Sequence, residues 1–145
     1  MLDTTNTNGD LRKSKWGYLN TKGEVVIPPK YFKAEDFSEG LAAVLTEKGW
    51  GYIDTTSKLV IDREFAWADN FSESLAAVYI GNNPAVGERN AIINKKGEVV
   101  IGCDLFNPNP FKKGISKYWT GYHFSGDIEY IRNDGKVIWG YSKLH

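Results

Sequence analysis

The chain contains the stretch KWGYLN at residues 15–20, and a variant of it, GWGYID, follows 34 residues later at residues 49–54. Extended outward from these two stretches, residues 15–44 align with residues 49–78, and fourteen of the thirty aligned pairs are identical. A period of this length is typical of proteins built from stacked structural repeats. The repeat, rather than any single residue, is therefore the feature that decides the fold.

A third and a partial fourth copy follow. KGEVVI at residues 96–101 repeats residues 22–27 after a further shift of 40, and six additional residues are expected to form a loop at residues 81–88. The fourth copy is the stretch YIRNDGKVI at residues 130–138. We divide the chain into a polar N-terminal segment or cap at 1–14, where no strand is predicted, and one repeat domain at 15–145. The copies lie near 15–48, 49–88, 89–126 and 127–145.

Each copy opens with a strand and a hairpin turn. Trp16 and Tyr18 alternate with Gly17 and Leu19, which is the period of two typical of a strand. NTKG at residues 20–23 then places a glycine where a short hairpin loop needs positive φ. Copy two has Ser57 at the position of that glycine, so its turn is predicted to be longer or differently shaped.

The rest of the copy is predicted to be strand as well. Pro28 and Pro29 are expected to end the second strand, since proline offers no donor to a sheet ladder. Leu-Ala-Ala within residues 40–45 favours helix by propensity, but Gly40 and Gly49 bracket the run closely, which favours a third strand.

A unit of about three short strands cannot bury its apolar face alone, so neighbouring units must stack and share a core. Trp16, Trp50, Phe37 and Phe71 recur at equivalent positions and are therefore predicted to lie in that core. The predicted fold is all-β: an open curved array of these units. A propeller-like ring is the alternative, although a propeller blade has four strands.

The stretches KWGYLN at residues 15–20, GEVVIP at 23–28 and FSEGLAAV at 37–44 resemble the bacterial WG-repeat family. The resemblance extends from residue 15 to about residue 139. Copy three departs from it with Asn90 and Ala91 in place of Trp-Gly, and copy four with Ile128 and Glu129. The resemblance implies tandem β units that act as interaction modules, and it supplies no catalytic residues to transfer.

Charge and cysteine content restrict the function classes. The chain has 18 basic and 18 acidic residues, so no strong field attracts a nucleic acid or an anionic membrane. Cys103 is the single cysteine, which excludes an internal disulfide framework and multi-thiolate zinc sites. The longest apolar run, residues 75–80, is too short to cross a bilayer. We expect a soluble, cytoplasmic protein with no cofactor, no metal and no nucleic-acid or membrane partner.

The candidate catalytic sets are weak. Cys103, His123 and Asp127 could be drawn as a nucleophilic triad, but single residues of these types occur by chance in most chains. Carboxylates at positions 35, 36, 69 and 73 could serve glycoside cleavage, yet most have acidic counterparts in the neighbouring copy, which favours solvent-facing or turn-stabilising roles. Lysines at 112, 113 and 117 are interpreted as a solvated edge. The chain is predicted not to be an enzyme.

Aromatic residues outside the repeat pattern are the candidate contact surface. Trp67 stands where copy one has Lys33, and Trp119, Tyr122 and His123 lie in a predicted extra hairpin. Large rings are enriched at binding hot spots, although these could instead cap the array. The leading hypothesis is a non-catalytic interaction module that binds another protein, for example as an immunity or inhibitor protein. Carbohydrate or cell-wall binding is the alternative.

Overall fold

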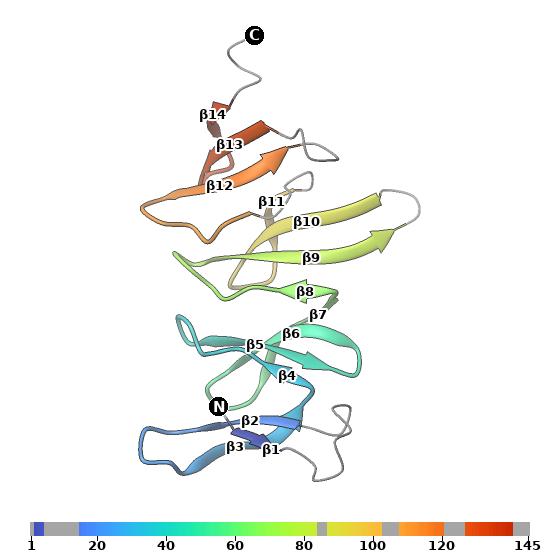
Figure 1. Ribbon diagram of the computed structural model, residues 1–145, viewed down its shortest axis with the longest axis vertical. Coiled ribbons are helices and arrows are strands. Elements are labelled where there is room, and N and C mark those ends of the chain that lie inside the picture. The colour runs from blue at the N-terminus through green and yellow to red at the C-terminus, as the bar shows by residue number, and fades with distance from the viewer. Residues whose placement is uncertain (1, 5–14, 84–86, 103–107, 121–126, 141–145) are drawn as a thin grey trace.

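The structure, a computed structural model, describes residues 2–4, 15–83, 87–102, 108–120 and 127–140 of the chain. Within these residues it contains only β-strands, which form four small antiparallel sheets that follow one another along the long axis (Figure 1). The row of sheets neither closes nor curls into a ring. The predicted open all-β array is therefore confirmed in place of the propeller-like alternative.

The first sheet has the order β1 (Leu2–Thr4), β2 (Lys15–Leu19), β3 (Val25–Tyr31). The second has the order β4 (Lys33–Ala34), β5 (Leu41–Thr46), β6 (Gly49–Asp54), β7 (Leu59–Phe65). The third has the order β11 (Val99–Ile101), β10 (Gly87–Asn94), β9 (Leu75–Asn83), β8 (Trp67–Ala68). The fourth has the order β12 (Ile115–Thr120), β13 (Asp127–Arg132), β14 (Val137–Gly140).

The sheets do not coincide with the sequence copies. Strands β4 and β5 come from copy one, but they share a sheet with β6 and β7 of copy two, and Leu45 lies opposite Trp50. The third sheet joins copies two and three in the same way. Strand β1, where no strand was predicted, pairs with β2 as β5 pairs with β6. Neighbouring copies thus interlock, as the need for a shared core predicted.

The glycine of the Trp-Gly pair faces a bulge in the neighbouring strand. Trp16 lies opposite Tyr31 and Tyr18 opposite Ile27, so β3 has two more residues than β2 over the same span. The bulge brings backbone so close that a Cβ atom on Gly17 would lie 2.3 Å from the Ile27 carbonyl oxygen. A Cβ on Gly51 would likewise lie 2.7 Å from the Ile61 oxygen. Glycine is required at both positions because the space is already filled by backbone.

The prediction that Pro28 and Pro29 end the strand is wrong, because β3 continues to Tyr31. Both prolines lie in the bulge of an edge strand. A bulge and an open edge leave backbone donors unpaired in any case, so the missing N–H of proline costs little there.

Two further local predictions need correction. Ser57 adopts φ 69° and donates its backbone N–H to the Asp54 carbonyl at 3.0 Å, as Gly23 does to Asn20, so the turn in copy two has the same shape. The Asp54 side chain holds this turn by accepting from the backbone N–H of Thr56 at 2.9 Å. Most of residues 81–88 extend β9 and β10 rather than forming a loop. The predicted third strand, by contrast, is confirmed as β5.

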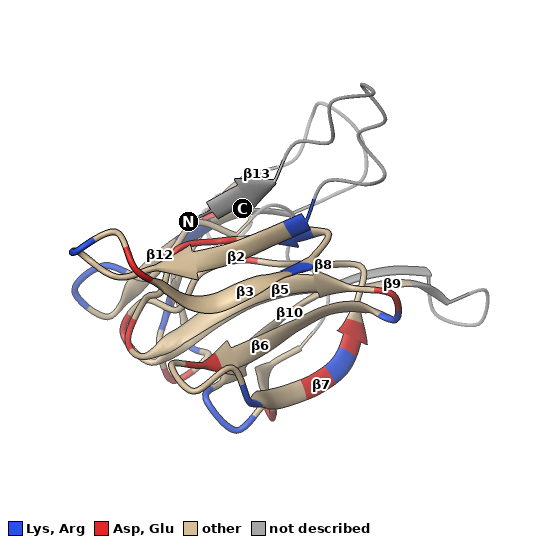
Figure 2. Cartoon of the chain, turned by 90° about the horizontal axis from the view of Figure 1, so that it is seen from below, with Lys and Arg blue, Asp and Glu red and all other residues tan. Residues whose placement is uncertain are grey.

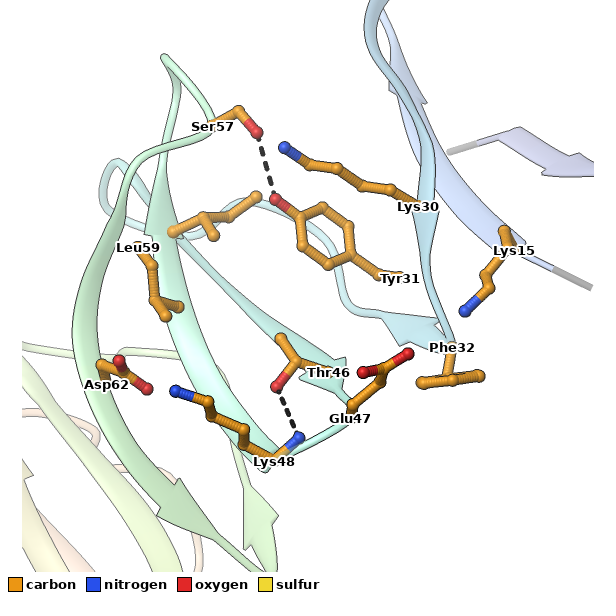
Figure 3. A pocket seen from close by; sticks show the side chains of 11 residues that line it. Lys15, Lys30, Tyr31, Phe32, Thr46, Glu47, Lys48, Ser57, Leu59 and Asp62 are labelled. Atoms are coloured by element: carbon orange, nitrogen blue, oxygen red, sulfur yellow. Dashed lines mark hydrogen bonds between the residues drawn. The ribbon is translucent and has the colours of Figure 1, made fainter.

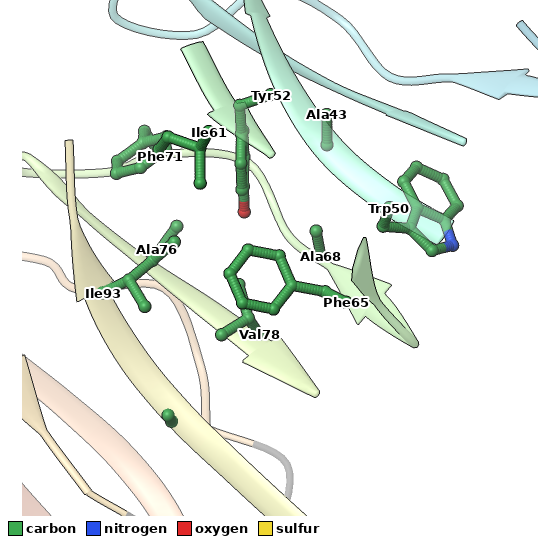
Figure 4. Close-up of a cluster of buried hydrophobic side chains, with 11 residues drawn as sticks. Ala43, Trp50, Tyr52, Ile61, Phe65, Ala68, Phe71, Ala76, Val78 and Ile93 are labelled. Atoms are coloured by element: carbon green, nitrogen blue, oxygen red, sulfur yellow. The ribbon is translucent and has the colours of Figure 1, made fainter. Parts of the chain in front are cut away.

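The repeat residues supply the core between the sheets (Figure 4). Trp50 and Phe71 are buried, as predicted, whereas Trp16 and Phe37 are partly buried and pack against the core of the first copy. Tyr52 is completely buried, and its hydroxyl donates to the Asp69 carbonyl at 2.6 Å. This bond recurs in copy one, where the Tyr18 hydroxyl donates to the Glu35 carbonyl at 2.8 Å.

Each Phe-Ser-Glu turn forms hydrogen bonds with the next turn along the array. Two hydroxyls donate to backbone carbonyls one copy ahead, Ser38 to Phe71 at 2.6 Å and Ser72 to Phe111 at 2.8 Å. Two carboxylates accept from backbone N–H groups one copy ahead, Glu39 from Ser74 at 2.9 Å and Glu73 from Gly114 at 2.7 Å. In the third turn Lys112 and Lys113 occupy these positions, and lysine has neither a hydroxyl nor a carboxylate to offer.

The buried tyrosines give a test of this core. Burial raises the pKa of Tyr18, Tyr52 and Tyr118 well above the usual value of 10, and in Tyr118 the hydrogen bond to Glu129 adds to the effect. Because the pKa of each hydroxyl is higher in the folded state than in the unfolded state, the folded state keeps the proton to a higher pH. The stability linked to these groups is therefore complete below pH 10 and is lost as the pH rises above it.

We expect these three hydroxyls to ionise only together with unfolding. Tyrosinate absorbance and β-sheet circular dichroism, recorded in one alkaline titration, check this. Ionisation of all eight tyrosines in a chain that keeps its β-sheet signal would contradict the expectation.

Candidate functional site

Trp67 is the residue of the predicted contact set whose side chain the structure describes. It lies on β8 and is 45% exposed. Its indole N–H donates to Asp69 Oδ1 at 3.1 Å, and its ring lies 5.1 Å from that of Trp50, centroid to centroid. An exposed ring held by both a hydrogen bond and a second ring is fixed in orientation, which suits a binding surface because little side-chain entropy is lost on contact.

The other predicted contact residues are placed only in part. Trp119 lies in β12 opposite Ile128 of β13, and its side chain is outside the described structure. Tyr122 and His123 lie outside the described residues, as does the tip of the predicted extra hairpin. The strands on either side of that tip, β12 and β13, pair with each other. That the four aromatic residues form one surface therefore stays a prediction.

Two of the candidate catalytic carboxylates, Asp69 and Glu73, have structural partners. Glu73 accepts a hydrogen bond from the next turn of the array, as its counterpart Glu39 does, and Asp69 accepts one from Trp67. Cys103 and His123 of the possible triad lie outside the described residues. In the part of the chain that is described, no three His, Cys, Asp or Glu residues are grouped to hold a metal ion. The same part has no helix of the length and hydropathy needed to cross a membrane.

A recurring feature that the sequence analysis missed is a pair of exposed aliphatic side chains in each of the first three copies. These aliphatic pairs are the first two residues of β3, β7 and β11, and each pair directly precedes a buried isoleucine. Their exposure is 36–53%, and in copy four Ile138 of β14 is exposed to 43%. The members are Val25 and Val26, Leu59 and Val60, Val99 and Val100. All lie on edge strands that succeed one another along the array (Figure 1).

The remaining length of two of these edge strands, β3 and β7, is protected against strand pairing. Beyond its aliphatic pair, β3 carries Pro28 and Pro29, and β7 carries the exposed charged residues Asp62, Arg63 and Glu64 (Figure 2). Prolines, bulges and charges are the usual means by which an exposed edge avoids adding a further strand. The aliphatic pairs therefore offer side chains to a partner, while the adjoining backbone edge is poorly suited to β-strand addition.

A cleft of about 450 Å³ opens beside the aliphatic pair of β7, between the first and second sheets. Figure 3 shows its charged lining: Lys15 and Lys30 come from the first sheet, and Lys48 and Asp62 from the second. Glu47 adds a second carboxylate, so the three lysines are largely balanced. Leu59 also lines the cleft, which places an apolar residue against a polar rim. That combination is typical of protein interfaces.

Comparison with known proteins supports the repeat. A family model described as WG containing repeat matches residues 16–48 and 50–83, which are copies one and two. The resemblance drawn from the sequence is thereby confirmed for residues 16–83. No curated protein and no solved structure matches the chain.

Proposed function

We propose that this chain, a WG-repeat protein, is a non-catalytic interaction module that binds another protein. The observation that carries the proposal is the recurrence of the aliphatic pairs on edge strands in successive copies. Single exposed aliphatic residues are common and need no explanation, but apolar surface that recurs in register along a molecule is characteristic of interaction sites.

The chemistry of this surface favours a protein partner. Aliphatic groups next to a charge-balanced cleft resemble the apolar centre and polar rim of a protein interface. A nucleic acid would require a net basic surface, whereas the chain has equal numbers of basic and acidic residues. If the partner is an enzyme that the module inhibits, as an immunity protein would, adding the module should lower that enzyme's activity.

The experiment is capture of a partner from a lysate of the source cell. In one variant, threonine, which keeps the β-branched shape of valine but carries a hydroxyl in place of one methyl group, replaces the six residues Val25, Val26, Leu59, Val60, Val99 and Val100. We expect this variant to retain at least tenfold less of the captured protein. Exposed substitutions of this kind change stability little, and circular dichroism checks that the variant is folded.

A matched control changes exposed polar residues on either side of the β7 pair, Lys58→Ser together with Arg63→Ser. This control should capture as much partner as the parent. Equal capture by the threonine variant would remove the aliphatic pairs as the contact. Failure of the parent to retain any protein would argue against the proposed function itself.

Carbohydrate binding is the second candidate, and the exposed Trp67 ring beside the Asp69 carboxylate is the observation that favours it. The aromatic face could stack on a sugar ring while the neighbouring carboxylate accepts hydrogen bonds from the hydroxyl groups of the sugar. A glycan array probed with the parent and with Trp67→Ala tests this candidate. Binding of a glycan by the parent alone would support it, and silence of the array would count against it.

A further inference from the structure

The tryptophan of the Trp-Gly pair is replaced in copy three. Asn90 stands at the position that Trp50 holds in copy two. In the second sheet Trp50 lies opposite Leu45, and in the third sheet Asn90 lies opposite Tyr79. Trp50 is 3% exposed and belongs to the same buried cluster as Ala43 and Ala68. A position that holds a buried indole in one sheet thus holds a short amide in the next.

A cavity of about 360 Å³ lies at Asn90. Its lining includes Ala77 and Pro108, which are the counterparts in the next copy of Ala43 and Ala68. Two residues that share a buried cluster with Trp50 therefore have equivalents around an open space at Asn90. We call this space the Asn90 cavity. Its volume falls within the range of small-molecule binding pockets.

The lining of the Asn90 cavity combines rings with hydrogen-bonding groups. Trp67, whose ring packs at a tilt against that of Trp50, also lines the cavity, and Tyr79 adds a second ring. Asp69 accepts from Trp67 through Oδ1, which leaves Oδ2 available to a ligand. The side-chain amide of Asn90 lines the cavity, and within the described part of the chain it has no hydrogen-bond partner. The site thus offers aromatic walls, a carboxylate oxygen and an unused amide.

We propose that the Asn90 cavity binds a flat aromatic ring of indole size that carries a ring N–H, replacing the side chain that copy three lacks. The ring packs against Trp67. Its N–H donates to Asp69 Oδ2 or to the side-chain oxygen Oδ1 of Asn90. The ring belongs either to a free indole-type molecule or to a tryptophan side chain of a protein. The site involves none of the aliphatic pairs, so the result here does not depend on the proposed function.

The first test adds three probes to the full chain: indole, N-acetyl-L-tryptophanamide and a methyl glucoside. Backbone amide resonances of residues 77–79 and 90 report binding. We expect saturable shifts with indole at about millimolar concentration, as befits a fragment-sized ligand. Equal binding of the tryptophan amide would identify a peptide-borne side chain as an acceptable source, and binding of indole alone would identify a free molecule. Shifts with the glucoside alone, or with none of the probes, would overturn the proposal.

The second test fills the cavity. Asn90→Trp should abolish indole binding and raise the melting temperature by about 2–4 °C, the usual gain from filling a cavity in a chain of this size. Asn90→Ala is the control, because it leaves the space open and should bind indole without any gain in stability. Asn90→Trp that still binds indole, at an unchanged melting temperature, would contradict the proposal.

A third variant covers the case in which Asn90→Trp does not fold. The ladder between β9 and β10 is irregular between Arg89 and Asn90, so the backbone there differs from that at Trp50. Trp67→Ala removes an exposed ring rather than adding a buried one, and it should weaken indole binding at least tenfold. Unchanged affinity in a folded Trp67→Ala protein would overturn the proposed stacking site.

Discussion

A Gly17→Ala variant is expected to lose about 3 kcal/mol or more of its free energy of unfolding, at the upper end of what overpacking costs. The added methyl group would lie 2.3 Å from the Ile27 carbonyl oxygen, 2.7 Å from the Pro29 nitrogen and 2.8 Å from the Pro28 carbonyl carbon. All three are backbone atoms, so no side chain can rotate away. The bulge of β3 would have to move, and with it the pairing of β2 and β3. Urea unfolding followed by circular dichroism measures the change.

Two other glycines supply a graded comparison. Gly51→Ala brings a Cβ to 2.7 Å from the Ile61 oxygen and 3.1 Å from the Leu59 side chain, so its cost should be smaller. Gly102→Ala meets no atom within 4 Å and should change stability by less than about 0.5 kcal/mol. If Gly17→Ala unfolded at the same urea concentration as Gly102→Ala, the bulge could not be the reason for the glycine.

The same geometry explains which parts of the fold were predictable. The period, the hairpin turn at residues 20–23 and the β5 strand follow from local pattern, and the sequence predicted all three, whereas the shape of the turn at Ser57 was predicted wrongly. The bulge at Pro28 was missed because its register depends on which residues of β2 it faces, and that is a property of the paired strands.

Of the candidate site, single unusual residues were predictable from the sequence, but their surroundings were not. Trp67 was identified because it departs from the repeat; its ring is exposed and hydrogen-bonded to Asp69, and its role as a contact residue stays a prediction. The aliphatic pairs were missed because a run such as Val-Val-Ile is typical of a buried strand. Only the sheet order shows that β3, β7 and β11 are edge strands. Asn90 was visible in the sequence as a lost tryptophan, but the cavity at that position emerges only when the second and third sheets are compared.

A Tyr52→Ala variant is expected to lose about 3–5 kcal/mol, which is typical when a large buried ring is removed. Tyr52 is 0% exposed, and its ring meets that of Phe71 edge to face with centroids 4.9 Å apart. Tyr52→Phe separates the ring from the hydroxyl. It should cost about 1–2 kcal/mol, because it keeps the packing but leaves the Asp69 carbonyl without its 2.6 Å hydrogen bond.

Tyr18→Ala is the matched comparison, because Tyr18 makes the equivalent bond in copy one, in the first sheet of the row. In a linear array, a sheet at the end has one described neighbour and a sheet inside has two, so the loss should be smaller at Tyr18 than at Tyr52. Chemical unfolding of both variants, followed by circular dichroism, measures the two losses. Equal losses would mean that the interlocked sheets share stability evenly over their length. A smaller loss at Tyr18 would instead show that each sheet draws its stability from its neighbours, which is the behaviour expected of sheets assembled from two copies each.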